Sequence, residues 1–338
     1  MQCQLESLTK QKTPRDIRKA LRSLPPTLEQ TYCATLARIQ REDFSIARQT
    51  LLWVTFALRP MTLEEISEAI IIGEGDTVIN NDVRLLRKET LLEICGSLLS
   101  YDASTTELTL AHSSVEQYLV SPDIQRSEVS AYYLDKATAD NAIVKRCLKY
   151  LLLPAFTSGC CLTHKSLARR YDEWPLLEYL ATTLFDHLDY INLDDEDMTA
   201  LLFRFFATHK LPRGGSFGAW VQAFIPSTSG NIEASTPLYY ASRFGLLSIV
   251  RLILSKDGTR ELELPGGVYR CTPLHVAAWA GRTEVVEYLL QQGANVKEVN
   301  KNGISGLMFA IKYGYTDIER MLREAGATLD GTACTGFT

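Results

Sequence analysis

Residues 272–281 read TPLHVAAWAG, and this stretch has a counterpart on each side. Residues 305–314 read SGLMFAIKYG, 33 positions further along the chain, and residues 236–245 read TPLYYASRFG, 36 positions earlier. Three related segments at a nearly constant spacing indicate a tandem repeat. We therefore expect the C-terminal third to be a stack of similar units.

Each segment has the composition of a short helix followed by a tight turn. A threonine or serine side chain caps such a helix well, and proline costs nothing in its first turn. Gly281 and its counterparts allow the positive φ of a turn between two antiparallel helices. A second helix follows, with apolar residues at helical spacing from Val285 to Leu290, and Gly293 ends it. Each unit therefore has an apolar face that only a neighbouring unit can bury.

The pattern T-P-L-H-x-A at a period of about 33 resembles the ankyrin repeat. The resemblance implies a helical solenoid over 233–330 with three repeats, at about 235–267, 268–303 and 304–330. It also implies a structural role for His275, which resembles the ankyrin histidine that bonds the backbone between neighbouring loops.

The first and last repeats depart from the central one. Tyr239 stands where the central repeat has His275, and the last repeat has Gly306 and Met308 in place of proline and histidine. The last predicted helix, from Ile318 to Ala325, is highly charged. Such departures are typical of the ends of an array, where one face meets water.

The composition indicates an ordinary globular protein. The chain has 338 residues, 46% hydrophobic and 22% charged, with a net charge of −5. No apolar run reaches the length of a membrane-spanning helix, and no secretory signal is visible. Eight scattered cysteines without a C-x-x-C pair indicate reduced thiols. We therefore expect a cytoplasmic or nuclear protein.

The first half predicts a mainly helical arrangement with one hairpin. One helix ends at Pro25-Pro26, and Thr27 with Gln30 indicates a capped restart, giving a helical segment over 1–42. The later elements are helices over 28–39, 44–58, 62–72, 82–98 and one from 112 to before 122, with a β-hairpin pairing 98–101 with 107–111. Three helices, a hairpin and a helix form a winged-helix plan over 43–122. A helical linker over 123–232 would follow it.

Several short sequence segments resemble those of fungal NACHT–ankyrin proteins of the STAND type. They are LPPTL at 24–28, RPMTLEE at 59–65, HSSVEQYL at 112–119 and WPLLEYL at 174–180. The resemblance implies that 1–42 corresponds to the end of a NACHT module, that 43–122 is the winged-helix segment and that 123–232 is the linker before the repeats.

The nucleotidase of that family requires a P-loop, and this sequence has no G-x-x-x-x-G-K-[ST]. Gly73-Glu74-Gly75 lacks a third glycine, and residues 214–218, GGSFG, have no following lysine. We interpret the first as a turn and the second as a flexible connector. The chain is thus expected to be a truncated relative or an incomplete gene model of such a protein.

No arrangement of residues indicates catalysis, a cofactor or a metal. His112 could act as a base beside Ser113 and Ser114, but we expect Ser113 to cap a helix and His112 to close the hairpin. Cys160-Cys161 lacks ligand-spaced partners and is expected in a loop flanking a helix. Residues 194–197, DDED, lack the alternation of a calcium loop and are expected at a solvated helix start.

The winged-helix segment has the wrong charge for nucleic acid. Residues 44–121 contain five basic and eleven acidic side chains, whereas phosphate contacts require positive charge. In the expected recognition helix, Arg84, Arg87 and Lys88 are offset by Asp82, Glu89 and Glu93. We expect a packing or relay module there.

The function favoured by the sequence is a non-catalytic scaffold or signalling adaptor that binds a protein partner through its repeats. Turn tips and inner helix faces are not used for stacking, so the binding surface is expected there. The residues at these positions are Val268, Tyr269, Arg270, Trp279, Arg282, Lys301, Asn302, Tyr313 and Tyr315. Two alternatives stay open: a transcription-associated coregulator that acts through a partner, and a fragment of a nucleotide-driven STAND switch. No small-molecule substrate, membrane or nucleic-acid partner is expected.

Overall fold

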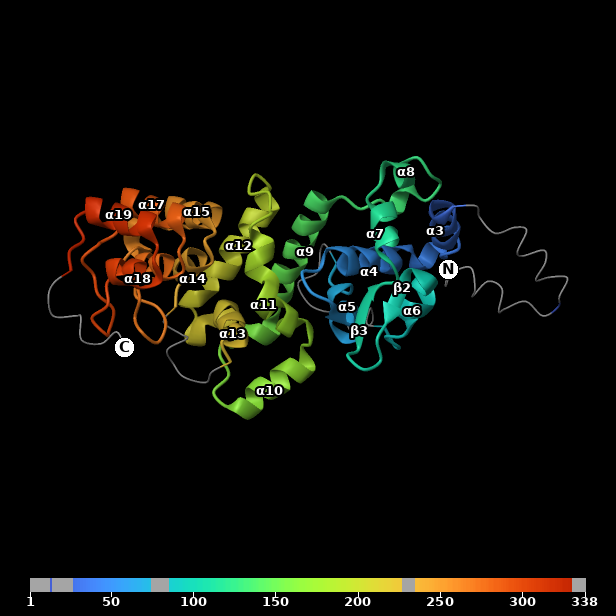
Figure 1. Ribbon diagram of the computed structural model, residues 1–338. Helices are drawn as coiled ribbons and strands as arrows, with labels where there is room; N and C mark the ends of the chain where they lie inside the picture. The colour runs from blue at the N-terminus through green and yellow to red at the C-terminus, as the bar shows by residue number, and fades with distance from the viewer. Residues whose placement is uncertain (1–12, 14–26, 74–84, 227–234, 330–338) are drawn as a thin grey trace. The chain divides into compact units, whose positions relative to one another are not determined.

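A computed structural model describes residues 27–73, 85–226 and 235–329, together with Thr13. The chain divides into two compact units, Met1–Cys147 and Leu148–Thr338, and the division falls within helix α9 (Lys136–Leu151). The labelled elements of Figure 1 are almost all helices. The helix expected before Pro25 lies outside the described residues.

The first unit combines short helices with a small sheet. Its helices are α3 (Leu28–Leu36), α4 (Phe44–Phe56), α5 (Leu63–Ala69), α6 (Thr90–Cys95), α7 (Ser113–Leu119) and α8 (Pro122–Gln125), and its strands are β1 (Met61–Thr62), β2 (Leu99–Tyr101) and β3 (Glu107–Leu110). Single 3₁₀ turns occupy Arg41–Asp43, Gly96–Leu98 and Ser130–Tyr132. Trp53, Leu51 and Ile66 are fully buried in its core. Helices followed by a hairpin give the winged-helix domain that the sequence predicts.

The sheet has three antiparallel strands in the order β1-β3-β2, one more than the expected hairpin. Leu99 pairs with Leu110 and Tyr101 with Leu108 in the hairpin, while β1 adds Met61 opposite Leu108. Thr62 ends β1 and caps α5 in the predicted capping box with Glu65. A two-residue strand with a distant partner leaves no alternating pattern in the sequence, which is why it was not predicted.

Two sequence predictions in this unit are wrong in detail. The helix expected over 82–98 begins only at Thr90, because residues 85–89 form bends and turns and Leu86 is fully exposed and joins no apolar face. The cap of α7 is His112 and not Ser113, since its Nδ1 accepts from the Ser114 amide at 3.1 Å. His112 lies just after the hairpin, as expected.

The second unit starts with a helical linker. Its helices are α10 (His164–Glu173), α11 (Leu176–Leu188), α12 (Glu196–Ala207) and α13 (Gly215–Phe224), with 3₁₀ turns at Pro154–Phe156, Thr208–Lys210 and Pro212–Gly214. Asp195 caps α12 by accepting from Asp197 and Met198, so the acidic run is a helix start, as predicted. The GGSFG segment is not a flexible connector: it opens α13, and Ser216 and Phe217 are buried.

Among the described residues, the ankyrin stack consists of three inner and three outer helices. The inner helices are α14 (Pro237–Phe244), α16 (Pro273–Trp279) and α18 (Gly306–Tyr313), and the outer helices are α15 (Leu247–Asp257), α17 (Thr283–Gln291) and α19 (Thr316–Glu324). A 3₁₀ turn follows α15 at Gly258–Glu261. Figure 1 shows the three helix pairs following one another at the C-terminal end of the second unit. Pro237, Pro273 and Gly306 each occupy the first helical position of their repeat, after a Thr or Ser cap that accepts from the amide three residues on. The repeats are therefore equivalent layers, as the sequence predicts.

Candidate protein-binding surface

Two turn tips connect the repeats, and they are bonded to each other. The first is closed by a bridge between Gly266 and Cys271, and the second by a bridge between Val299 and Ser305. The Lys301 amide donates to the Tyr269 carbonyl at 3.0 Å, and the Lys301 Nζ lies 5.4 Å from the centre of the Tyr269 ring. The tips therefore form one continuous edge of the array.

A second row of side chains lies at the C-terminal ends of the inner helices. The Arg243 guanidinium lies 5.1 Å from the centre of the Trp279 ring, and the Trp279 Nε1 donates to the Tyr313 hydroxyl at 3.1 Å. The Tyr313 ring stacks on Tyr315 at 6.1 Å between centroids. One cation and three aromatic rings thus link all three repeats. We call these four side chains the helix-end row.

The residue after each helix-ending glycine leans back onto the preceding repeat. Arg282 Nε donates to the Arg243 carbonyl at 3.1 Å and its side chain lies over Gly245. Tyr315 occupies the corresponding place one repeat later, with its ring over Gly281. These contacts fix the spacing of neighbouring layers at this end of the helices.

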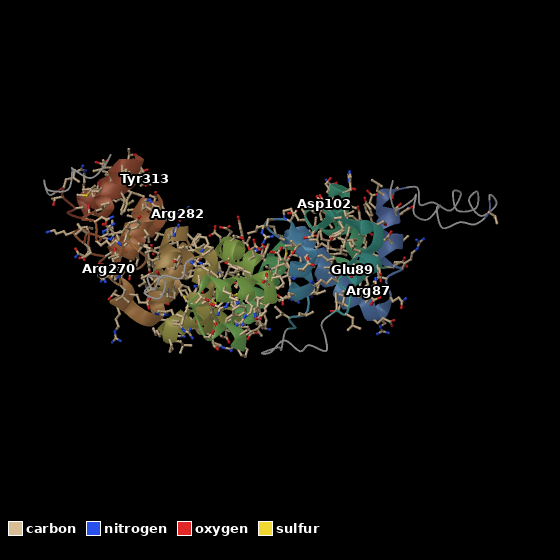
Figure 2. All side chains as sticks on the ribbon, turned by 90° about the horizontal axis from the view of Figure 1, so that it is seen from below. Arg87, Glu89, Asp102, Arg270, Arg282 and Tyr313 are labelled. Carbon is tan, nitrogen blue, oxygen red and sulfur yellow. The ribbon has the colours of Figure 1, made fainter. Side chains whose placement is uncertain are left out.

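The structure places the nine predicted surface residues in two groups. Val268, Tyr269, Arg270, Lys301 and Asn302 lie on the turn tips, and Trp279, Arg282, Tyr313 and Tyr315 lie at the helix ends. All are exposed except Tyr315, which is half-buried. Trp279 and Tyr313 contact each other across repeats and still expose 37% and 47% of their surface. Figure 2 shows Arg270, Arg282 and Tyr313 on the repeats.

Sequence reasoning missed two basic residues of this surface. Arg243 lies between the Trp279 ring and the Phe224 ring, whose centre is 5.6 Å from its guanidinium. Lys312 Nζ lies 5.9 Å from the Tyr313 ring. Both occupy the repeat position of Trp279, so aligning the three segments by register would have found them.

His275 has the structural role that the resemblance implies. Its Nδ1 accepts from the Thr272 amide at 3.2 Å, so Nε2 carries the proton and donates to the Glu298 carbonyl at 3.0 Å in the next connection. Burial lowers the pKa of His275 to about 4. The ring is therefore neutral at physiological pH and ties two repeats together.

The other candidate sites have local structural roles. The His112 Nδ1 and the Ser114 Oγ lie 2.8 Å apart at the cap of α7, and the Ser114 Oγ also meets the Tyr32 hydroxyl. Cys160 and Cys161 lie in the loop before α10, and neither forms a disulfide. Within the described ranges, no three His, Cys, Asp or Glu side chains gather as metal ligands. None of the described helices combines the length and apolarity needed to cross a bilayer.

The basic residues expected on a recognition helix precede α6 and meet carboxylates. Lys88 Nζ lies 3.2 Å from Glu64 Oε1, and Arg87 forms an ion pair with Glu93. Figure 2 shows Arg87 beside Glu89 in this domain. Arg84 lies outside the described residues.

Comparison with family models finds both architectures in the sequence. Ankyrin repeats in three copies match residues 213–300 and 238–333, and the winged helix domain of GPI inositol-deacylase matches residues 32–130. The chain thus contains ankyrin repeats and a winged-helix domain of this type.

Similar proteins cover different shares of the chain. The azaphilone pigments biosynthesis cluster protein L of Monascus ruber is 27% identical over 307 residues, which are 82% of this chain and 61% of that protein. The palmitoyltransferase AKR1 of Lachancea kluyveri is 36% identical over 81 residues, 24% of this chain and 11% of that protein. Ankyrin repeat and SAM domain-containing protein 6 of Mus musculus is 33% identical over 94 residues, 27% of this chain and 10% of that protein. The chain therefore spans less than two thirds of each of these relatives.

Proposed function

We propose that this chain is a non-catalytic adaptor that captures a protein partner on its ankyrin repeats, in the cytoplasm or the nucleus. Ankyrin repeats are an architecture for protein–protein interaction, and the observation that supports a docking surface here is the half-exposed helix-end row of Arg243, Trp279, Tyr313 and Tyr315. Tryptophan, tyrosine and arginine contribute most to binding when they lie in a partly desolvated cluster. The row is also held rigidly by contacts between repeats, so little side-chain freedom is lost on binding.

The charge of the surface supports an acidic partner segment. Five basic side chains lie on or beside it: Arg243, Arg270, Arg282, Lys301 and Lys312. Arg243, Arg270 and Lys301 form no ion pair with the described carboxylates. Because the whole chain carries a net charge of −5, this face differs in sign from the average surface. Complementary charge speeds encounter and excludes wrong partners.

Two other functions compete with this proposal. A coregulator of transcription would use the same surface, and it requires no DNA contact by the winged-helix domain, whose Arg87 and Lys88 already meet carboxylates. A fragment of a STAND switch would depend on a separate NACHT module for its nucleotide chemistry. The resemblance to NACHT–ankyrin proteins is what supports this alternative. The adaptor differs from both because its partner binds without DNA and without nucleotide.

The test is affinity capture from a fungal lysate with the full chain as bait, followed by mass spectrometry. The variant Tyr269→Ala/Trp279→Ala removes one ring from each group of the surface, and we expect it to lose the partner while its melting temperature stays within a few degrees. Adding ATP or nuclease should not change the captured set. Retention of every partner by this folded variant would refute the proposed surface.

A matched control lies on the outer helices. The Arg251 guanidinium lies 5.2 Å from the Tyr288 ring, a pair of the same kind as Arg243 and Trp279. The variant Arg251→Ala/Tyr288→Ala removes one cation and one ring from the outer helices α15 and α17 and leaves both groups of the proposed surface intact. We expect this control to keep the partner.

A further inference from the structure

A cavity of about 440 Å³ lies in the linker of the second unit, apart from the ankyrin surface. Its walls come from the loop before α10, from α10 itself and from the turn before α13. The side chains that matter are Ser158, Arg169, Arg170, Glu173, Trp174 and Arg213. A volume of this size suits a small organic ligand.

The lining is strongly positive. Three arginines contribute to it, and Glu173 is the one carboxylate among its lining residues. Glu173 Oε1 lies 3.5 Å from Arg169 Nε, and both side chains are mostly exposed, so this pair leaves the other two guanidinium groups unneutralised. The cavity therefore carries an excess of two positive charges in a chain whose net charge is −5.

Arg170 is the buried member of the three. Only 9% of its surface is exposed, its guanidinium lies 6.0 Å from the Phe156 ring and Nη2 donates to the Ser158 hydroxyl at 3.4 Å. Nη1 is buried and has no hydrogen-bond partner among the described residues. A buried cation with an unused donor is unfavourable unless an anion accepts from it.

Arg213 is held in the cavity wall by a strained backbone. Its φ of 55° lies in the left-handed region, which is unfavourable for a non-glycine residue. The Arg213 carbonyl accepts from the Cys160 amide at 3.0 Å. A Cβ on Gly159 or Gly218 would lie 2.2 or 2.5 Å from that oxygen, so both glycines are required for this contact. Such enforced strain is concentrated at ligand sites.

We propose that this cavity binds a phosphomonoester dianion. The guanidinium groups of Arg170 and Arg213 donate to the phosphate oxygens, as arginine does in bidentate phosphate recognition. Trp174 is half-buried and its ring packs edge-on against Tyr150 and Phe156, which leaves it as an apolar wall for the organic part. A dianion matches the excess of two charges, and a monoanionic carboxylate does not.

The test uses the full chain and phenyl phosphate in isothermal titration calorimetry, with benzoate as the monoanion and phenol as the neutral ligand. We expect saturable binding of phenyl phosphate and much weaker binding of the other two. The deciding variant is Arg213→Gly. Glycine adopts the positive φ without strain, so the melting temperature should hold or rise while affinity falls about tenfold or more.

The control variant is Arg204→Gln, which removes an exposed charge from α12 away from the cavity and should bind as the wild type does. A phosphotyrosine peptide distinguishes the source of the phosphate. Binding of the peptide as tightly as phenyl phosphate assigns the site to phosphorylated protein, and binding of phenyl phosphate alone assigns it to a small metabolite. Absence of phenyl phosphate binding by the wild type, or equal affinity in Arg213→Gly, overturns the proposal.

Discussion

Gly281 is required for two separate reasons. Its φ of 69° lies in the left-handed region, and a Cβ at this position would lie 2.7 Å from the Tyr315 ring of the next repeat. Gly314 occupies the same repeat position with a φ of 73°, but a Cβ there meets nothing within 4 Å. The pair therefore separates backbone strain from crowding between repeats.

We expect Gly314→Ala to lower the free energy of unfolding by about 1 kcal/mol, through strain alone. Gly281→Ala should lower it by about 2–3 kcal/mol, because Tyr315 must also move. Urea denaturation followed by circular dichroism measures both. Equal losses of unfolding free energy in the two variants would show that the Tyr315 ring moves aside without an energetic penalty.

His275 makes the stability of the repeats depend on pH. The folded state holds its pKa near 4, mainly through burial, against 6.5 for an ordinary histidine. Its contribution is complete above pH 6.5 and is lost as the pH falls towards 4, because only the unfolded chain takes up the proton. Between pH 7.5 and pH 5 this amounts to about 2 kcal/mol.

The measurement is urea denaturation at both pH values for the wild type, His275→Gln and His164→Gln. His164 is exposed at the start of α10, so its variant controls for loss of a histidine. We expect the dependence on pH to shrink by about 2 kcal/mol in His275→Gln only. If the free energy of unfolding depends on pH in His275→Gln as it does in the wild type, the His275 ring is protonated in the folded state at the lower pH.

At the scale of elements, the start of α5 depends on a carboxylate with two roles. Glu65 Oε2 accepts from the Thr62 amide at 2.8 Å and from Arg59 Nη1 at 2.9 Å. The Glu65 side chain is 4% exposed and the Arg59 side chain 34%. Removing Arg59 and removing Glu65 should therefore lower the stability by different amounts, since only the arginine side chain reaches water.

We expect Arg59→Met to lower the free energy of unfolding by about 2 kcal/mol, because it leaves a buried carboxylate without its cation. Glu65→Gln should cost about 1 kcal/mol, since glutamine retains the acceptor of the capping box. A double-mutant cycle by urea denaturation gives the coupling. A larger loss in Glu65→Gln than in Arg59→Met would contradict this account of the pair.

The elements that the sequence predicted correctly are those held by local contacts. The cap of α16 at Thr272 and the turn at Gly281 involve residues a few positions apart, so their pattern is readable. Strand β1 pairs with Leu108 far along the chain, and the start of α6 depends on Leu86 staying outside the core. Features of this kind depend on tertiary packing and leave no periodic pattern in a single sequence.

The same distinction holds for sites at the scale of the whole molecule. Trp279 and Tyr313 were predictable because both stand at the end of an inner helix of the repeat, and Arg243 follows because it occupies the repeat position of Trp279 in the first repeat. The arginine cavity was not predictable, because Arg213 meets Gly159 and Arg170 only in the folded linker. Repeats make a surface periodic, whereas a cavity between different elements has no period.

The linker also serves the repeats as a cap. Phe244 at the end of the first inner helix lies 4.7 Å from Phe185 of α11 and 5.4 Å from Phe224 of α13, between ring centroids. Tyr240 meets Trp220 of α13 at 5.6 Å. An end repeat needs a cover over its apolar face, and these rings supply it for α14.

We therefore expect a chain of residues 135–329 to unfold in one cooperative transition, and a chain of residues 235–329 to aggregate or melt without a transition. The shorter chain keeps every helix of the three repeats, so its failure would come from the exposed rings on α14. Thermal denaturation by circular dichroism, with light scattering, measures both. Replacing Phe244 by Gln in the shorter chain should restore solubility if exposure is the cause. A shorter chain that melts as sharply and as high as the longer one would show that the repeats need no cover from α11 and α13.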